Sequence, residues 1–385
     1  MTQSRTGEAG DSGQPTRRAF LASITGLGLA GITGLPNQRA TARTRPLTAP
    51  TLTNQQLAGQ RVISSYPGLT PPSSLFNDIT AGQTAGVIFF GENISSNTQI
   101  AEVITQLRQA QAQSPIQVPL LLMTDQEGGL VRRLPGEPLL SAKQIGRSAN
   151  PVDAATTAGT GAGQNLAGVG MNVNLAPVLD VYYKSGNFID QSQRSYSKDP
   201  NVASVCGQAF ITAQQATGVA ATAKHFPGLG SATRSQNTDA RPVTLTVSLT
   251  KLHTIDEVPY PAAVTAGVKL VMLSWAVYQA LDPTRPAGLS ATIISQELRG
   301  RNGFTGVTIT DALEAGALGS FGSTGQKAVM AAGAGMDLIL CSARDLTQAE
   351  GATTALATAL GNGQLDPTAF NNAVNRVTAL RAGLF

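Results

Sequence analysis

Short apolar runs of strand length recur along the chain, and each run ends in turn or polar residues. Longer stretches with apolar positions at helical spacing lie between them, such as Asn97–Gln113, Ala154–Ala167, Asn201–Gln215 and Gly325–Ala334. Continuous apolar strands that alternate with amphipathic helices indicate a parallel sheet covered by helices. The predicted strands are Arg61–Ser64, Gly86–Phe90, Val118–Thr124, Val173–Leu179, Ala221–Lys224, Leu270–Ser274, Val307–Thr310 and Leu338–Leu340.

Eight strand-helix units favour closure of the sheet into a single α/β domain, a (β/α)8 TIM-type barrel over residues 55–385. The alternative is an open, doubly wound sheet. No glycine-rich phosphate loop opens a first helix, which weighs against that alternative.

The first fifty residues have the pattern of a targeting segment. A basic pair, Arg17-Arg18, precedes an apolar run from Phe20 to Leu35, and Ala40-Thr41-Ala42 resembles a cleavage site. We expect a twin-arginine signal peptide over residues 1–42 and a linker over residues 43–54, with secretion of the folded protein. The apolar run is too short for a permanent span and no cysteine follows it, so no stable membrane anchor is expected. The alternative is a disordered tail in which the two arginines are paired by chance.

Composition and charge restrict the partners. The formal net charge is +4, and six arginines precede residue 50, which leaves the rest close to neutral. With 5% aromatic residues as well, no nucleic-acid surface is expected. Cys206 and Cys341 could form a disulfide or be two buried thiols, and the second interpretation is favoured. No spacing of Cys or His indicates a metal, and no cofactor is predicted.

Polar and charged residues follow several predicted strands. Asp125, Asp180, Lys224 with His225, and Asp311 come directly at strand ends. In a barrel the carboxyl ends of the strands carry the chemistry, so these side chains should surround one pocket. Buried charges are costly unless they are paired, so the pattern favours a polar ligand with several hydroxyl groups.

Five segments in order resemble glycoside hydrolase family 3, specifically its β-N-acetylglucosaminidases. Each segment is similar to one family motif, and together they span about residues 55–385. They are Met123–Gly129 with Val131 and Arg133 (DQEGGxVxR), Asn174–Val181 (NxAPVxDV), Arg194–Pro200 (RSFGxDP), Lys224–Gly228 (KHFPG) and Gly306–Leu313 (GVxxTDAL).

The resemblance implies roles for individual residues. Asp311 matches the nucleophile, which would form a glycosyl-enzyme intermediate and retain the anomeric configuration; the alternative is a helix-capping aspartate. Asp125 matches the carboxylate that holds sugar hydroxyls, with a structural ion-pair network to Arg133 or Arg194 as the alternative. The other positions that match sugar-binding residues are Arg133, Arg194, Lys224 and His225. The implied partner is a carbohydrate.

The chain departs from the family where the general acid/base is expected. The Asp-x-His dyad of the family falls on Ser235 and Asn237, and the chain has only two histidines, His225 and His253. Asp239 is the one carboxylate in the loop over residues 230–242. It would substitute for the dyad if the loop folds inward; otherwise it is a solvated loop residue beside Arg241.

Trp275 stands where these enzymes have a histidine. It would either stack on a sugar face or close the floor of the pocket.

Three functions remain open. The first is a glycosidase active on N-acetylglucosaminides such as cell-wall fragments, with Asp311 as nucleophile and a substitute acid. The second is a catalytically degenerate barrel that binds a glycan. The third is an enzyme that transfers glycosyl groups from activated donors. The retained nucleophile favours the first, because a protein that only binds sugar does not need it.

Overall fold

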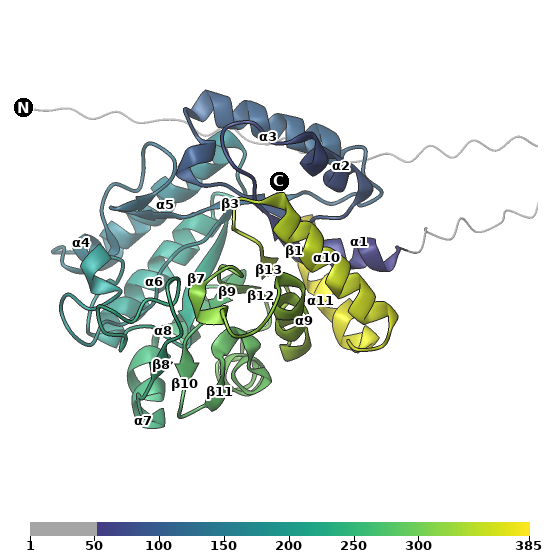
Figure 1. Ribbon diagram of the computed structural model, residues 1–385. Helices are drawn as coiled ribbons and strands as arrows, with labels where there is room; N and C mark the ends of the chain where they lie inside the picture. The colour runs from purple at the N-terminus through teal and green to yellow at the C-terminus, as the bar shows by residue number, and fades with distance from the viewer. Residues whose placement is uncertain (1–51) are drawn as a thin grey trace, which may run out of the picture. The chain divides into compact units, whose positions relative to one another are not determined.

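The computed structural model describes residues 52–385. The predicted signal peptide and most of the predicted linker therefore lie outside the described residues. Eight parallel strands form one sheet at the centre, and helices surround it (Figure 1). In hydrogen-bonded order they are β12 (Val307–Thr310), β9 (Leu270–Leu273), β7 (Ala220–Phe226), β6 (Val173–Asn174), β3 (Leu121–Thr124), β2 (Gly86–Ile88), β1 (Val62–Ser64) and β13 (Ile339–Leu340).

Closure of the sheet confirms the predicted barrel. Each strand pairs in parallel with its neighbour in chain order. The two ends of the series meet through a parallel bridge between Ile309 and Leu338, supported by a 3.0 Å hydrogen bond from the Thr310 amide to the Leu338 carbonyl oxygen. The doubly wound alternative is thereby excluded, because an open sheet has no such bridge.

Side chains alternate between two cores along the strands. In β9, Leu270 and Met272 belong to the cluster inside the barrel, whereas Val271 and Leu273 belong to the larger cluster between the barrel and the helices. Both faces of the strand are buried. This explains why the strands have continuous apolar sequences rather than alternating ones.

Eleven α-helices of the described region cover the sheet. They are α1 (Asn54–Gly59), α2 (Ser73–Ala81), α3 (Asn97–Gln111), α4 (Ala142–Gly146), α5 (Pro151–Val169), α6 (Pro200–Gln215), α7 (Leu249–Lys251), α8 (Pro259–Thr265), α9 (Thr324–Ala334), α10 (Leu346–Gly361) and α11 (Pro367–Ala382). Two π-helical segments, η3 (Leu252–Asp256) and η5 (Ile293–Arg301), follow α7 and precede β12. Short 3-10 turns are η1 (Gly91–Asn93), η2 (Asp190–Ser192), η4 (Ala287–Leu289) and η6 (Gly316–Leu318).

Local sequence signals define where the helices begin. Asp199 accepts a hydrogen bond from the Asn201 amide at 2.9 Å, and Pro200 occupies the first turn of α6. Ser323 forms a capping box with Gln326 at the start of α9. The four helices predicted from periodicity are therefore present with ends within three residues of expectation.

The fourth predicted strand is shorter than expected. Regular pairing in β6 stops at Asn174, although the prediction extended to Leu179. Pro177 has no amide hydrogen to donate, and only an isolated bridge between Val178 and Lys224 continues the pairing.

The described region contains two further small sheets beside the barrel sheet. Strands β4 (Gln126–Gly128) and β5 (Val131–Arg132) form an antiparallel pair directly after β3, and β8 (Thr244–Leu245), β10 (Val277–Tyr278) and β11 (Asp282–Pro286) form the other sheet. Cys206 and Cys341 are both buried and unpaired, which agrees with the favoured interpretation as thiols. Within residues 52–385 no helix has the length and hydrophobicity to cross a membrane.

Candidate active site

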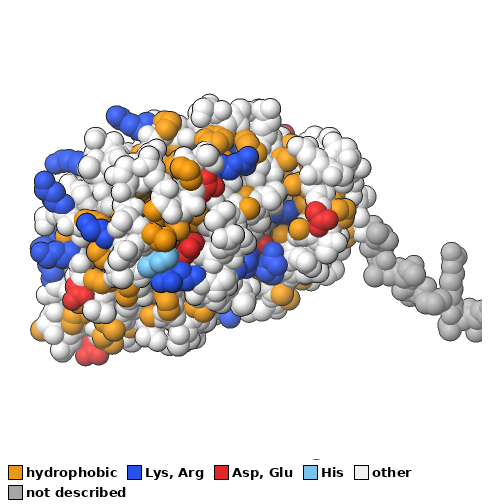
Figure 2. All heavy atoms as spheres, turned by 90° about the horizontal axis from the view of Figure 1, so that it is seen from below, with side chains coloured by type: hydrophobic (Ala, Val, Ile, Leu, Met, Phe, Trp, Pro, Cys, Tyr) orange, Lys and Arg blue, Asp and Glu red, His pale blue; other side chains and the backbone are white. Residues whose placement is uncertain are grey.

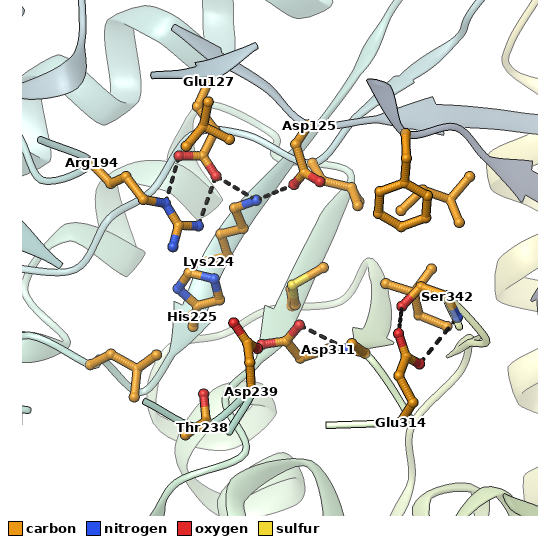
Figure 3. Close-up of a pocket in the computed structure, with 18 of the residues that line it drawn as sticks. Asp125, Glu127, Arg194, Lys224, His225, Thr238, Asp239, Asp311, Glu314 and Ser342 are labelled. Atoms are coloured by element: carbon orange, nitrogen blue, oxygen red, sulfur yellow. Dashed lines mark hydrogen bonds and ion pairs between the residues drawn. The ribbon is translucent and has the colours of Figure 1, made fainter. Parts of the chain in front are cut away.

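A cavity of about 280 Å³ lies where the carboxyl ends of the barrel strands meet. Side chains from β7 and from the loops after β2, β3, β12 and β13 surround it (Figure 3). All seven residues predicted to carry function line this cavity: Asp125, Arg133, Arg194, Lys224, His225, Asp239 and Asp311. Barrel closure therefore brings them together from six separate segments of the chain.

Lys224 is at the centre of the charged wall of the cavity. Ala220 of β7 points into the barrel, so Lys224, an even number of residues later, shares its face. Its Nζ lies 2.7 Å from Asp125 Oδ1 and 2.8 Å from Glu127 Oε1, and the residue is 2% exposed. Burial alone lowers the pKa of Lys224, but the two carboxylates outweigh it and hold the pKa above its usual value.

Arg194 completes this network from the loop before α6. Its Nε and Nη2 donate to the two oxygens of Glu127 at 2.9 and 2.8 Å, a bidentate pair. Burial tends to raise the pKa of Glu127, but Arg194 and Lys224 together hold it well below its usual range. Glu127 thus stays ionised and fixes two cations that face the cavity.

The partners differ from the predicted ones. Asp125 pairs with Lys224, and Arg194 pairs with Glu127, whereas the sequence suggests Arg133 or Arg194 as the ionic partner of Asp125. Arg133 lines the cavity, and its buried Nε has no hydrogen-bond partner among the described residues.

His225 is oriented by Asp180, which was expected among the residues around the pocket but is buried behind them and does not line the cavity. Its Nδ1 lies 2.7 Å from Asp180 Oδ2, and the second oxygen, Oδ1, accepts a 2.6 Å hydrogen bond from the Leu229 amide. Asp180 is 1% exposed and lies behind the histidine. Since Nδ1 is engaged, Nε2 is the ring nitrogen left for the cavity.

Asp311 follows the last residue of β12 and is partly exposed in the cavity. Its Oδ1 accepts a 2.7 Å hydrogen bond from the Ala312 amide. Burial raises the pKa of Asp311, His225 opposes this, and the charge of Asp239 adds to the increase. Asp239 is therefore close enough for its charge to act on Asp311, and both carboxyl groups appear in Figure 3.

The loop over residues 230–242 turns towards the cavity. Its backbone docks on η6: the amides of Gly316 and Ala317 donate to the carbonyl oxygens of Asp239 and Thr238 at 2.8 and 2.9 Å. A Cβ at Gly316 would clash with the backbone of Ala240, so glycine permits this close approach.

The same loop contributes Thr238 and Asp239 to the cavity, whereas Ser235 and Asn237 do not line it. Asn237 instead holds the turn, because its Oδ1 accepts from the Asp239 amide at 2.8 Å. The exposed side chain of Asp239 thus faces the cavity rather than only bulk solvent.

Trp275 does not stack on a ligand in this cavity. It is 1% exposed, is absent from the cavity lining, and donates through Nε1 to the Ala312 carbonyl oxygen at 2.8 Å. It supports the turn that carries Asp311. Of the two roles considered for Trp275, stacking on a sugar face is therefore excluded, because the indole is covered by protein.

Three further cavity residues escaped the sequence analysis. Phe90 follows β2, Arg344 follows β13, and Glu314, three residues after Asp311, accepts from Ser342 Oγ at 2.7 Å. The sequence contains a signal for two of them, because Phe90 and Arg344 also follow barrel strands. On the face drawn in Figure 2, acidic and basic side chains are interspersed among hydrophobic ones.

Comparisons with known proteins agree with this geometry. The family description "Glycosyl hydrolase family 3 N terminal domain" matches residues 55–380. A protein of Arthroderma benhamiae named "Uncharacterized secreted glycosyl hydrolase" is 46% identical, over 85% of this chain and 93% of its own length. "Beta-hexosaminidase A" of Pseudoalteromonas piscicida is 30% identical, over 82% of this chain and 56% of its own length.

Solved structures give the same result. A family 3 β-N-acetylglucosaminidase from Paenibacillus sp. str. FPU-7 superposes with a TM-score of 0.81 and 33% identity, over 86% of this chain and 63% of that one. β-N-Acetylhexosaminidase from Beutenbergia cavernae superposes with a TM-score of 0.77 and 31% identity, over 86% and 99%. The chain thus spans less than two thirds of some relatives and nearly all of others.

A barrel with paired carboxylates and cations around a cavity at its strand ends has the architecture of a TIM-barrel enzyme. The chain belongs to glycosyl hydrolase family 3, a family of glycosidases.

Proposed function

We propose that this protein hydrolyses β-linked N-acetylglucosaminides with retention, with Asp311 as nucleophile and Asp239 as general acid/base. The substrate class rests on the similar hexosaminidases and N-acetylglucosaminidases. The observation that carries the mechanism is that the loop over residues 230–242 presents Asp239, and neither Ser235 nor Asn237, to the cavity that contains Asp311.

The two carboxyl groups have complementary tasks in this proposal. Asp311 attacks the anomeric carbon and forms a glycosyl-enzyme ester, while Asp239 gives a proton to the leaving oxygen. Asp239 then removes a proton from the water that opens the ester. Lys224, Asp125, Arg194 and Arg133 hold the sugar hydroxyls, and His225, oriented by Asp180, offers Nε2 as a further partner.

The test compares two substrates and two variants. An aryl N-acetylglucosaminide with a good leaving group needs little acid assistance, whereas N,N′-diacetylchitobiose needs a proton at the leaving oxygen. Asp311→Asn should abolish hydrolysis of both substrates, by about 10³-fold or more. Asp239→Asn should reduce hydrolysis of the disaccharide by about 10²–10⁴-fold and that of the aryl substrate much less.

Azide provides an independent check on the assignment of the acid/base. An anionic nucleophile needs no base, so azide should accelerate the Asp239→Asn variant on the aryl substrate and yield the β-glycosyl azide. Asp153→Asn, an exposed aspartate on α5, is the matched control and should behave as the unmodified protein. Equal loss on both substrates without azide rescue would refute Asp239 as the acid. Binding without turnover of either substrate would favour the glycan-binding alternative.

We further propose export through the twin-arginine pathway. The name of the Arthroderma relative includes secretion, and residues 16–42 have the required order of basic pair, apolar run and small-residue site. Replacement of Arg17 and Arg18 by lysine should retain the protein in the cytoplasm, whereas the same replacement of Arg43 and Arg45 should not. Unchanged secretion of the first variant would contradict the proposal.

A further inference from the structure

A second group of ionisable side chains lies outside the active site. His253 belongs to η3, Glu257 follows that segment directly, and Glu297 belongs to η5. One potential ligand atom from each residue lies within 4.8 Å of the other two. None of the three lines the catalytic cavity. This cluster brings together an imidazole and two carboxylates, which the substrate-binding cavity does not explain.

Both segments that carry the cluster are π-helical. Such turns are rare and occur frequently at functional sites. His253 and Glu257 are four residues apart, so they project from the same side of one turn, and Glu297 meets them from the neighbouring segment. His253 Nε2 lies 3.1 Å from Glu297 Oε2.

Glu257 has an unused acceptor in a buried position. The residue is 2% exposed, and its Oε2 accepts a 2.9 Å hydrogen bond from Asn302 Nδ2. Its other oxygen, Oε1, is buried and has no hydrogen-bond partner within residues 52–385. Buried carboxylates normally have their oxygens bonded or coordinate a metal.

The nearby Arg301 does not form a hydrogen bond with the Glu257 carboxylate. Arg301 Nε lies 3.6 Å from Glu257 Oε2 and 3.8 Å from Glu297 Oε2, which exceeds hydrogen-bond length, and its side chain is 47% exposed. A cation bound directly to the three ligands would displace this guanidinium towards solvent, to which its side chain is already about half exposed.

We propose that His253, Glu257 and Glu297 bind one divalent transition-metal ion of the zinc type, which ties η3 to η5 on the outside of the barrel. One imidazole nitrogen and two carboxylate oxygens form a ligand set that zinc accepts, with water in the fourth position. Calcium and magnesium prefer oxygen ligands alone.

Zinc bonds of about 2.0–2.2 Å require the three ligand atoms to approach one another slightly. The side chains of His253 and Glu297 are 21% and 16% exposed and have room to rotate.

The first experiment is calorimetric titration of chelator-treated, full-length protein with zinc, calcium and magnesium salts. Zinc should bind with one-to-one stoichiometry and raise Tm by about 2 °C or more at saturation, whereas calcium and magnesium should bind far more weakly. Hydrolysis of the aryl substrate should not require the metal, because the cluster lies outside the cavity. Failure of zinc to bind would overturn the proposal.

Variants then locate the ion. His253→Gln and Glu297→Gln should each weaken zinc binding by at least about tenfold, while Arg301→Gln should strengthen it by removing the competing cation. His253 and Glu297 are partly exposed, so these variants should fold even if Glu257→Gln does not. His225→Gln is the matched control, because His225 is the other histidine of the chain. Loss of binding in His225→Gln but not in His253→Gln would place the ion in the active site and overturn the proposal.

Discussion

Buried charges are costly unless they are paired, and the protein pairs them in two networks at opposite ends of the barrel strands. One network contains Lys224 and Glu127 at the carboxyl ends of the strands, and the other contains Asp337 just before β13. Before β13, Asp337 is 0% exposed; its Oδ1 accepts from Arg376 at 2.7 and 3.0 Å, and its Oδ2 accepts from Arg299 and from the amide and hydroxyl of Thr308. Both oxygens of Asp337 are therefore bonded within the protein, although the side chains of its partners Arg299 and Arg376 are 23% and 34% exposed.

The network at the carboxyl ends of the strands is left open. Lys224 and Glu127 are nearly as buried as Asp337, but the side chains of Asp125 and Arg194 are 17% and 20% exposed and line a cavity. Paired charges therefore stabilise the fold at one end of the strands and prepare a binding surface at the other. The difference lies in the carboxylates, since the ionic bonds have similar lengths. Both oxygens of Asp337 accept hydrogen bonds, whereas among the described residues Asp125 accepts a side-chain hydrogen bond through Oδ1 alone.

The largest effect is expected when the network around Asp337 is broken. Asp337→Asn removes the charge that pairs with Arg376 and Arg299 and should reduce the free energy of unfolding by about 3–5 kcal/mol, measured by urea denaturation. KM for the aryl substrate should not change. Asp366→Asn at the exposed start of α11 is the control, because asparagine caps a helix about as well as aspartate. A loss below about 1 kcal/mol would show that this network contributes little to stability.

Breaking the network at the carboxyl ends of the strands should weaken sugar binding more than it lowers the free energy of unfolding. Asp125→Ala removes one partner of Lys224 and one acceptor for sugar hydroxyls, while Glu127 still neutralises the lysine. The Kd for N-acetylglucosamine, measured by calorimetry, should rise about tenfold or more, equivalent to about 1.4 kcal/mol. The free energy of unfolding should fall less than in Asp337→Asn. An unchanged Kd would refute the placement of the sugar site.

The third prediction is confined to low pH and concerns acid sensitivity. The pKa of Glu127 is held well below its usual range when the protein is folded. Its contribution to stability is therefore complete above the unfolded value of about 4.3 and is lost as the pH falls towards the folded value. Between pH 5 and 3, unfolding free energy should fall less steeply for Glu127→Gln, by up to about 1.4 kcal/mol per pH unit. Equal slopes would show that Glu127 is not stabilised by its two cations.

The strand-helix alternation and most of the cavity residues could be predicted because both are properties of short segments. Apolar runs of strand length identify barrel strands, and chemistry in a barrel follows strand ends. The sequence therefore predicts that Asp125, Lys224 and Asp311 surround one pocket, and the structure brings them to it. Assignment to the family likewise required only motifs in order, and the comparisons confirm it.

Partner choice and burial were decided by the tertiary structure alone. Asp125 and Lys224 are 99 residues apart, so barrel closure rather than local sequence determines that they pair. The same holds for Asp180 behind His225, for the burial of Trp275 beneath the Asp311 turn, and for the meeting of His253 with Glu297. Sequence periodicity encodes which side of its own element a residue occupies, whereas a contact between elements depends on the position and rotation of both, which only the packed barrel specifies.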